Sequence, residues 1–141
     1  MSDMQVEVTR DYAFAAETVW GVLADFGDLS WADNPSTEVI GSGPGMIRRI
    51  RMPGLAPIDE VLDAIDHMAR ELSYSIPRGL PMPVRDYAAH IRVESLAPDA
   101  CRVRWSATAT PIGVSAEDAG KIIEGAYGQM LVWLEERLQQ S

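Results

Sequence analysis

A chain of 141 residues, 47% of them hydrophobic, is long enough to bury about two-thirds of its unfolded surface in one core. Its formal net charge of −9 excludes a nucleic-acid partner and disfavours an anionic membrane surface, because both attract clustered Lys and Arg. Cys101 is the single cysteine, which excludes an internal disulfide and a cysteine-based metal site. We therefore expect one globular domain over residues 1–141.

No targeting or membrane-spanning segment is recognisable. Residues 1–4 provide neither a charged nor an apolar leader region, and no apolar run approaches the roughly 18 residues that a membrane span needs. These features predict a cytoplasmic protein without membrane insertion. They leave the oligomeric state open, a homodimer included.

The first part of the chain is predicted to contain one strand followed by two short helices. Residues 5–10 alternate between polar and apolar side chains, which is typical of a half-exposed strand. Residues 15–24 change to helical spacing and place Val19, Trp20 and Leu23 on one face, and residues 25–29 are expected to add a second short helix. The polar stretch after Trp31 is expected to be a loop.

Short alternating segments dominate from residue 38 to residue 110. Turn signals separate them at residues 41–45, 53–54, 67–70, 77–83 and 97–99. The pattern predicts an antiparallel meander of about six strands, which with residues 5–10 makes a seven-stranded sheet.

The register of two hairpins follows from separating apolar from charged side chains, because one face of the sheet is expected to be buried. A turn about Gly54 sets Arg48 opposite Glu60 on the apolar face and leaves Asp59 on the solvated face. A turn near Asp99 puts His90 outside. The inward residues of that second hairpin are then Tyr87, Ala89, Ile91, Val93, Val103, Trp105, Ala107 and Ala109.

Residues 115–138 are predicted to form a helix of about 36 Å, at 1.5 Å per residue. Ser115 is the expected N-cap, because two acidic residues follow it in the first turn. The apolar stripe is expected at Ala119, Ile123, Ala126, Met130 and Leu134, widened by Ala116, Tyr127, Leu131 and Leu138. Glycines within the helix indicate close packing, space beside a ligand or simple tolerance on a buried helix; they are Gly120, Gly125 and Gly128. The economical arrangement is an α+β fold in which the curved sheet wraps around this helix.

Seven short motifs, in this order and spacing, resemble the polyketide cyclase/dehydratase-like branch of the START/Bet v 1 (SRPBCC) superfamily. They are residues 16–20 (AETVW), 25–29 (DFGDL) with Trp31, 43–48 (GPGMIR), 60–62 (EVL), 72–76 (LSYSI), 83–87 (PVRDY) and 104–105 (RW). The resemblance implies a helix-grip fold with seven strands, two short helices and a long C-terminal helix around a cavity for hydrophobic small molecules. Function transfers less well than fold, because the superfamily contains both binders and aromatase/cyclases.

Arg48 and Glu60 are the most informative pair of candidate site residues. A buried ion pair is expensive to desolvate, so its place on an apolar face suggests a second purpose. The functional interpretation is that Arg48 binds a carboxylate, carbonyl or enolate of a ligand while Glu60 orients it, with Tyr74 as a general acid near Arg48. In the cyclase branch that the chain resembles, an arginine in the cavity is thought to place the polyketide, and Arg48 matches it by motif position. The alternative is a cross-strand salt bridge at a sheet edge or cavity mouth.

Several aromatic and methionine side chains are predicted to face the cavity, where they would stack on a planar ligand, donate a hydrogen bond or fill the core. Core filling is the simpler interpretation for Trp105 and Met130. The predicted ligand-binding set is Trp31, Arg48, Glu60, Tyr74, Met82, Tyr87, Trp105, Tyr127 and Met130, and the catalytic candidates are Arg48, Glu60 and Tyr74.

Other chemistries are not supported by the sequence. The glycine-rich residues 41–45 lead into a strand and lack the Gly-Lys-Ser/Thr of a phosphate loop. His67 and His90 do not combine with carboxylates at a metal-binding spacing, and His67 is expected to be solvated. No cofactor, metal or nucleic acid is expected.

The leading hypothesis is a protein that binds a hydrophobic small molecule, such as a lipid, a polyketide or an aromatic compound, in an internal cavity. Two alternatives stay open. One is a polyketide cyclase/dehydratase-type enzyme that uses the same cavity, and the other is a partner-binding accessory module.

Overall fold

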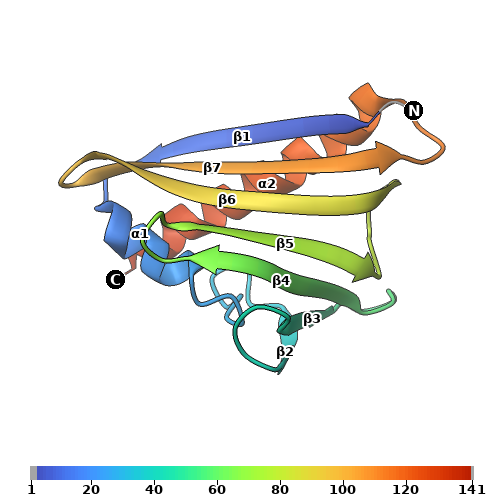
Figure 1. The fold of residues 1–141 in the computed structure, drawn as a ribbon, viewed down its shortest axis with the longest axis horizontal. Helices are drawn as coiled ribbons and strands as arrows, with labels where there is room; N and C mark the ends of the chain where they lie inside the picture. Colours follow the sequence, from blue (N-terminus) through green and yellow to red (C-terminus); the bar gives the residue numbers. More distant parts are fainter. Residues whose placement is uncertain (1–2, 141) are drawn as a thin grey trace.

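The computed structural model describes residues 3–140, in which seven strands and two helices follow one another (Figure 1). Residues 1–2 and 141 lie outside the described residues. All three belong to the expected domain, and residues 1–2 also belong to the start that was predicted to lack a leader. The elements are β1 (Met4–Tyr12), α1 (Ala16–Leu23), β2 (Ser36–Ile40), β3 (Ile47–Arg51), β4 (Ile58–Asp66), β5 (Glu71–Arg78), β6 (Val84–Ala97), β7 (Ala100–Pro111) and α2 (Ala116–Gln139).

The strands form one antiparallel sheet in the order β1-β7-β6-β5-β4-β3-β2. The predicted registers are confirmed: Arg48 pairs with Glu60 across β3 and β4, and Ile91 pairs with Trp105 across β6 and β7. Because the side-chain period of a strand is two, these registers decide which residues reach the core. The α+β class, the seven strands and the long C-terminal helix are as predicted.

The core lies between the inner face of the sheet and α2. Alternate residues of β6 and β7 are buried, and Val103 and Cys101 on β7 are completely inaccessible to solvent. His90, on the opposite face, keeps 45% of its side chain exposed. The strict alternation of apolar and charged residues therefore produces one buried and one solvated face.

Helix α2 crosses one face of the sheet diagonally (Figure 1) and packs mainly against β1 and β7. Its N-terminus is capped as predicted, because the Ser115 side chain accepts a hydrogen bond from the Asp118 amide at 3.0 Å. The Tyr12 hydroxyl donates to the Leu131 carbonyl oxygen at 2.7 Å and ties β1 to the helix. A Cβ at Gly120 would lie 3.2 Å from Val6, so this glycine allows close packing.

The predicted second helix after β1 is wrong. Residues 25–34 form successive turns, in which the Asp28 amide bonds to the Asp25 carbonyl and the Asp28 carboxylate accepts from the Ser30 amide at 2.9 Å. Such local side-chain bonds compete with helical ones. Asp33 and Asn34 then take left-handed φ values of 62° and 46°, so the chain turns toward β2.

Two exposure predictions are also wrong. Asp59, expected on the solvated face, is only 5% exposed because Arg49 covers its carboxylate. Ala126, expected in the centre of the buried stripe of α2, is exposed. The buried line of the helix runs through Ile123, Tyr127 and Leu131, where a helix that crosses the sheet diagonally meets it.

Candidate functional site: an apolar cavity under α2

A cavity of about 600 Å³ lies between α2, the inner face of the sheet and the loop before β2. This volume is in the range of small-molecule sites in proteins, roughly 300–1,000 Å³. Its wall is mostly apolar and includes Leu29, Ala32, Ile50, Met52, Pro53, Ile58, Ile76, Pro81, Met82, Trp105, Ala126, Met130 and Trp133. The charged residues of the wall are Asp33, Arg51 and Glu60.

The position of α2 explains the cavity. The helix packs mainly against β1 and β7, at one edge of the sheet, so the inner faces of β3, β4 and β5 are not filled by helix side chains alone. The turns at residues 25–35 cover part of this space with Phe26, Leu29 and Ala32. The remaining volume is the cavity.

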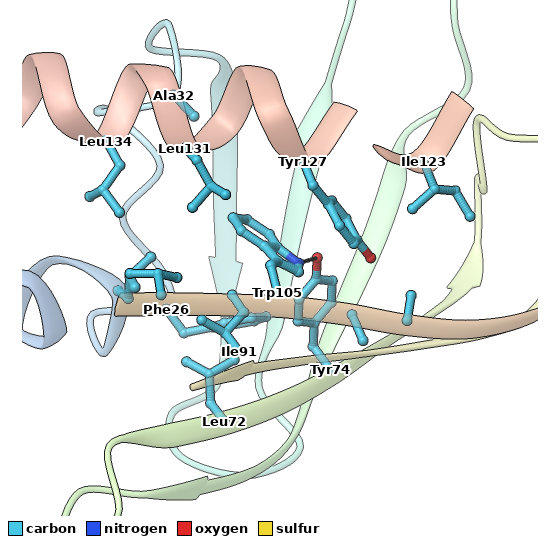
Figure 2. Close-up of a cluster of buried hydrophobic side chains, with 14 of the residues drawn as sticks. Phe26, Ala32, Leu72, Tyr74, Ile91, Trp105, Ile123, Tyr127, Leu131 and Leu134 are labelled. Carbon is cyan, nitrogen blue, oxygen red and sulfur yellow. Dashed lines mark hydrogen bonds between the residues drawn. The ribbon is translucent and has the colours of Figure 1, made fainter. Parts of the chain in front are cut away.

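Three tyrosine hydroxyls and one indole form a hydrogen-bonded cluster in the wall of the cavity. The Trp105 indole donates to the Tyr74 hydroxyl at 3.2 Å, the Tyr74 and Tyr87 hydroxyl oxygens are 3.4 Å apart, and Tyr87 is bonded to the Tyr127 hydroxyl. Figure 2 shows Tyr127 reaching from α2 toward the sheet beside the Trp105 ring, with Tyr74 below them. We call these four residues the tyrosine cluster.

Each member of the tyrosine cluster is positioned by its own element. Tyr74 and Trp105 occupy inward positions of β5 and β7, and the Trp105 ring stacks on Tyr127 with 4.9 Å between centroids. Tyr87 lies within an irregularity in the pairing of β6 with β7, directly after Asp86, which has a φ of 55°. Bulges of this kind redirect a side chain, and here the following residue points inward.

Burial raises the pKa of Tyr74, Tyr87 and Tyr127 far above the usual value of about 10. For Tyr74 the negative charge of Glu60 is the second cause, whereas hydrogen bonding to Tyr87 opposes the shift. The hydroxyls are therefore neutral donors and acceptors at physiological pH. A Tyr74 phenol of this kind is a poor proton source for catalysis, because a general acid works best with a pKa near the working pH.

Arg48 lies behind the cavity wall rather than in it. Its Nε and Nη2 contact Glu60 Oε1 at 2.7 and 2.6 Å, and its Nη1 donates to the Phe26 carbonyl oxygen at 2.8 Å. The guanidinium carbon also sits 3.9 Å from the centroid of the Phe26 ring. The side chain is 6% exposed, so the guanidinium is occupied by the protein itself. Glu60 is the member of the pair that reaches the cavity.

The cavity brings together seven of the nine predicted ligand-binding residues: Glu60, Tyr74, Met82, Tyr87, Trp105, Tyr127 and Met130. It does not include Arg48 or Trp31. Trp31 is buried, donates to the Asp28 carbonyl oxygen at 3.1 Å and lines a separate polar hollow beside the C-terminal end of α2. Because Trp31 lies in a series of turns, neither strand nor helix periodicity could predict where its side chain points.

Trp133 and the loop residues at the cavity mouth belong to the wall but were not among the predicted ligand-binding residues. Trp133 follows Met130 by three residues on α2 and therefore lies near it on the helix surface, a signal that helical spacing offered. The mouth residues Asn34, Pro53 and Pro81 come from three loops. No periodicity applies to loops, so these had no comparable signal.

Within residues 3–140, no group of three or more His, Cys, Asp and Glu is arranged to hold a metal ion. His67, in the β4–β5 turn, is exposed and its Nδ1 accepts a hydrogen bond from the Trp20 indole at 3.3 Å. In the same part of the chain, no helix is both long and apolar enough to cross a bilayer.

Comparison with known proteins identifies the family. The profile of the family described as polyketide cyclase/dehydrase and lipid transport matches residues 3–139. No curated protein sequence matches the chain.

Solved structures show the same fold. The protein XoxI from Bacillus cereus is similar with a TM-score of 0.83 and 26% identity, covering 96% of each chain. Norcoclaurine synthase from Thalictrum flavum, solved with dopamine and hydroxybenzaldehyde, has a TM-score of 0.77 at 20% identity over 99% of this chain and 88% of its own. Ara h 8.0201 has a TM-score of 0.78 at 15% identity over 99% of this chain and 100% of its own, so these last two show a shared fold. The chain therefore belongs to the polyketide cyclase/dehydrase and lipid transport family of the Bet v 1-like SRPBCC superfamily.

Proposed function

We propose that this protein binds a hydrophobic, planar small molecule in the cavity under α2. The observation that carries the proposal is the cavity of about 600 Å³ with its mostly apolar wall and the stacked rings of Trp105 and Tyr127. Aromatic faces of this kind favour planar ligands. The family is consistent with hydrophobic ligands, and one structural relative was solved with two small aromatic compounds.

Binding is better supported than catalysis. The three catalytic candidates are bonded within the protein: Arg48 donates to Glu60 and to the Phe26 carbonyl oxygen, while Tyr74 is bonded to Trp105 and Tyr87. A cyclase that used Arg48 to bind the developing enolate would need its guanidinium in the cavity wall, and Arg48 is not among the residues that line the cavity. The proposal therefore assigns Arg48 to the support of Glu60.

Thermal unfolding with 2-ethylnaphthalene, an aromatic hydrocarbon, tests the proposal. A ligand that binds only the native state raises the midpoint of unfolding, and the rise continues with the logarithm of the free ligand concentration above the dissociation constant. We expect a concentration-dependent rise for the wild type and none for Ala126→Trp, which places an indole at the cavity wall. Native mass spectrometry of the purified protein, beside an organic extract, would identify a co-purified ligand.

Gln129→Trp is the matched control, because residue 129 is exposed on the same helix and outside the cavity wall. It should keep the wild-type response. An unchanged unfolding midpoint for the wild type at saturating hydrocarbon would refute the proposal, and so would an equal rise in Ala126→Trp.

A further inference from the structure

The Glu60 carboxylate has a hydrogen-bond partner at only one of its two oxygens. Arg48 Nε and Nη2 both contact Oε1, at 2.7 and 2.6 Å, and within residues 3–140 no hydrogen bond reaches Oε2. In that part of the chain, Arg10 Nε is the fully buried side-chain nitrogen or oxygen without a partner. The unpartnered Oε2 is therefore not fully buried, and the open space that Glu60 borders is the cavity.

The neighbouring acid Asp59 shows the contrasting arrangement. It is also paired with an arginine of β3, but Arg49 donates to both of its oxygens, at 2.7 and 3.2 Å. Asp59 does not belong to the cavity wall. Each carboxylate oxygen accepts hydrogen bonds independently. Glu60 thus keeps an acceptor available at the wall, whereas Asp59 uses both of its oxygens within the protein.

The other polar groups of the wall are already engaged. The hydroxyls of the tyrosine cluster interact with one another, and the indole of the cluster donates to one of them. Arg51 is exposed at the mouth and bonds to Glu38 at 3.1 Å. A ligand that fills the cavity keeps water from Glu60 Oε2, and a charged acceptor that is covered without a donor is costly. A ligand that brings its own donor avoids this cost.

We propose that the cavity selects planar apolar ligands that carry an O–H or N–H donor, and that Glu60 Oε2 accepts the hydrogen bond from this donor while Arg48 holds Oε1. This inference rests on the proposed function and adds the chemical class of the ligand. Arg48 is then a positioning residue, because it fixes the carboxylate from behind the wall without contacting the ligand.

Equilibrium dialysis of three naphthalenes tests the inference. 2-Naphthol carries a hydroxyl donor, 2-methoxynaphthalene keeps the oxygen without a donor, and 2-ethylnaphthalene is the hydrocarbon that tests the proposed function. We expect 2-naphthol to bind about threefold to thirtyfold more tightly than the ether, because a hydrogen bond to a charged acceptor outweighs the burial of one extra methyl group.

Glu60→Gln assigns this preference to one residue. The amide oxygen of glutamine still accepts from Arg48, so its amide nitrogen, a donor, takes the place of Oε2. The preference for 2-naphthol over the ether should therefore fall by about tenfold or more. Asp59→Asn is the matched control, an acid-to-amide change at an arginine-paired neighbour on β4 that lies outside the cavity wall. It should keep the wild-type preference.

A double variant gives a second test that does not leave one charge buried alone. Arg48→Met with Glu60→Leu replaces the ion pair by apolar side chains of similar size, a change that proteins often tolerate. Its preference for 2-naphthol over the ether should also fall by about tenfold or more, while 2-ethylnaphthalene still binds. Circular dichroism of each variant establishes that it is folded.

The outcomes separate this inference from the proposed function. Binding of 2-ethylnaphthalene with 2-naphthol no tighter than the ether overturns the inference and leaves the cavity as a binding site. Failure of all three probes to bind the wild type overturns both. A 2-naphthol preference that persists in folded Glu60→Gln and in the double variant assigns the acceptor to another group and overturns the role of Glu60.

Discussion

Arg48 is held from three sides in the interior of the protein: by the Glu60 carboxylate, by the Phe26 carbonyl oxygen and by the face of the Phe26 ring. An ion pair of this kind adds little net stability compared with apolar residues of the same size, because both charges lose their hydration. Removing only one of the two charged partners has a different effect. One charge is then left buried without its partner.

We therefore predict that Arg48→Ala lowers the free energy of unfolding by about 3–5 kcal/mol, as measured by urea denaturation. Arg51→Ala, on the same strand but with its side chain 54% exposed, should cost less than about 1 kcal/mol. The double variant Arg48→Met with Glu60→Leu should recover most of the loss. An Arg48→Ala cost no greater than that of Arg51→Ala would contradict this account of the pair.

Asp59 gives the protein a specific sensitivity to acid. Two hydrogen bonds from Arg49, at 2.7 and 3.2 Å, hold the pKa of the Asp59 carboxyl below its usual value of about 3.9, and desolvation opposes them only in part. A carboxyl whose pKa is lower in the folded state stabilises the protein above the unfolded-state pKa. That contribution is lost as the pH falls through the folded-state pKa.

Accordingly, Asp59→Asn should be less stable than the wild type at pH 7, and its stability should fall less steeply below about pH 4. Arg49→Met, which removes the partner, should flatten the acid limb in the same way. Urea denaturation at a series of pH values measures both slopes. Parallel profiles for the wild type and the two variants would show that Asp59 does not carry this dependence.

At the residue scale, the sequence predicted the partner of Arg48 but not its place relative to the cavity. The alternation of β3 and β4 fixed the register, and the register placed Glu60 opposite. The third contact of the guanidinium comes from Phe26, in turns whose path depends on tertiary packing rather than on periodicity. Arg48 is not among the residues of the cavity wall, and the register alone did not predict this.

Two glycines show how differently the elements constrain the chain. Gly79, directly after β5, has a φ of 78°, and a Cβ there would lie 1.9 Å from the Pro57 carbonyl oxygen. Backbone cannot move aside as a flexible side chain can. Gly125, within α2, has no atom within 4 Å of the place where its Cβ would lie.

From this contrast we expect opposite effects of the same substitution. Gly79→Ala should destabilise the protein by more than the roughly 1–2 kcal/mol of left-handed strain alone, because the clash with Pro57 is added. Gly125→Ala should stabilise it by about 1 kcal/mol through helix propensity. Differential scanning calorimetry of the two variants provides the comparison. A tolerated Gly79→Ala would mean that the loop before β4 is free to shift.

Elements with a clear period were predictable, and those without one were not. The helix at the C-terminus was found from its N-cap and its apolar stripe, and the strands were found from their alternation. The stripe of α2 was placed too near Ala126, because helical spacing alone does not say how the helix crosses the sheet. Residues 25–29 contain apolar residues at short spacing, but the hydrogen bond from the Ser30 amide to Asp28 ends any helical tendency.

On the scale of the whole molecule, the two edges of the sheet differ in how well other elements cover them. β1 and β7 are packed under α2, whereas β2, at the other end of the strand order, is bonded only to β3 and is largely exposed. The cavity lies against the inner faces of β3, β4 and β5, between these two edges of the sheet. The arrangement predicts unequal local stability, because exposed backbone hydrogen bonds open at lower free-energy cost.

Native-state hydrogen exchange should show this inequality. Amides of β2 and β3 should exchange faster than those of β6 and β7, and 2-ethylnaphthalene should slow exchange in β3 while leaving β1 unchanged. Mass spectrometry of peptic peptides resolves these strands. Uniform protection across the sheet, or a ligand effect spread evenly over it, would contradict the division.

The order of motifs along the chain was sufficient to predict the family and the sheet, and the profile match over residues 3–139 agrees with it. The size of the cavity was beyond prediction. It depends on where α2 sits over the sheet and how loops with residues such as Asn34 and Pro81 close its mouth, and both are properties of the assembled molecule.

Cys101 has no exposed surface and lies on β7 opposite Tyr12, and burial raises the pKa of its thiol. The thiolate is the form that reacts, so alkylation requires the β1–β7 pair to separate. Because Cys101 is the sole cysteine of the chain, its alkylation reports at a single site on the separation of these two strands. The rate at which iodoacetamide modifies the native protein then measures how often the best-covered part of the sheet becomes accessible, with no label added.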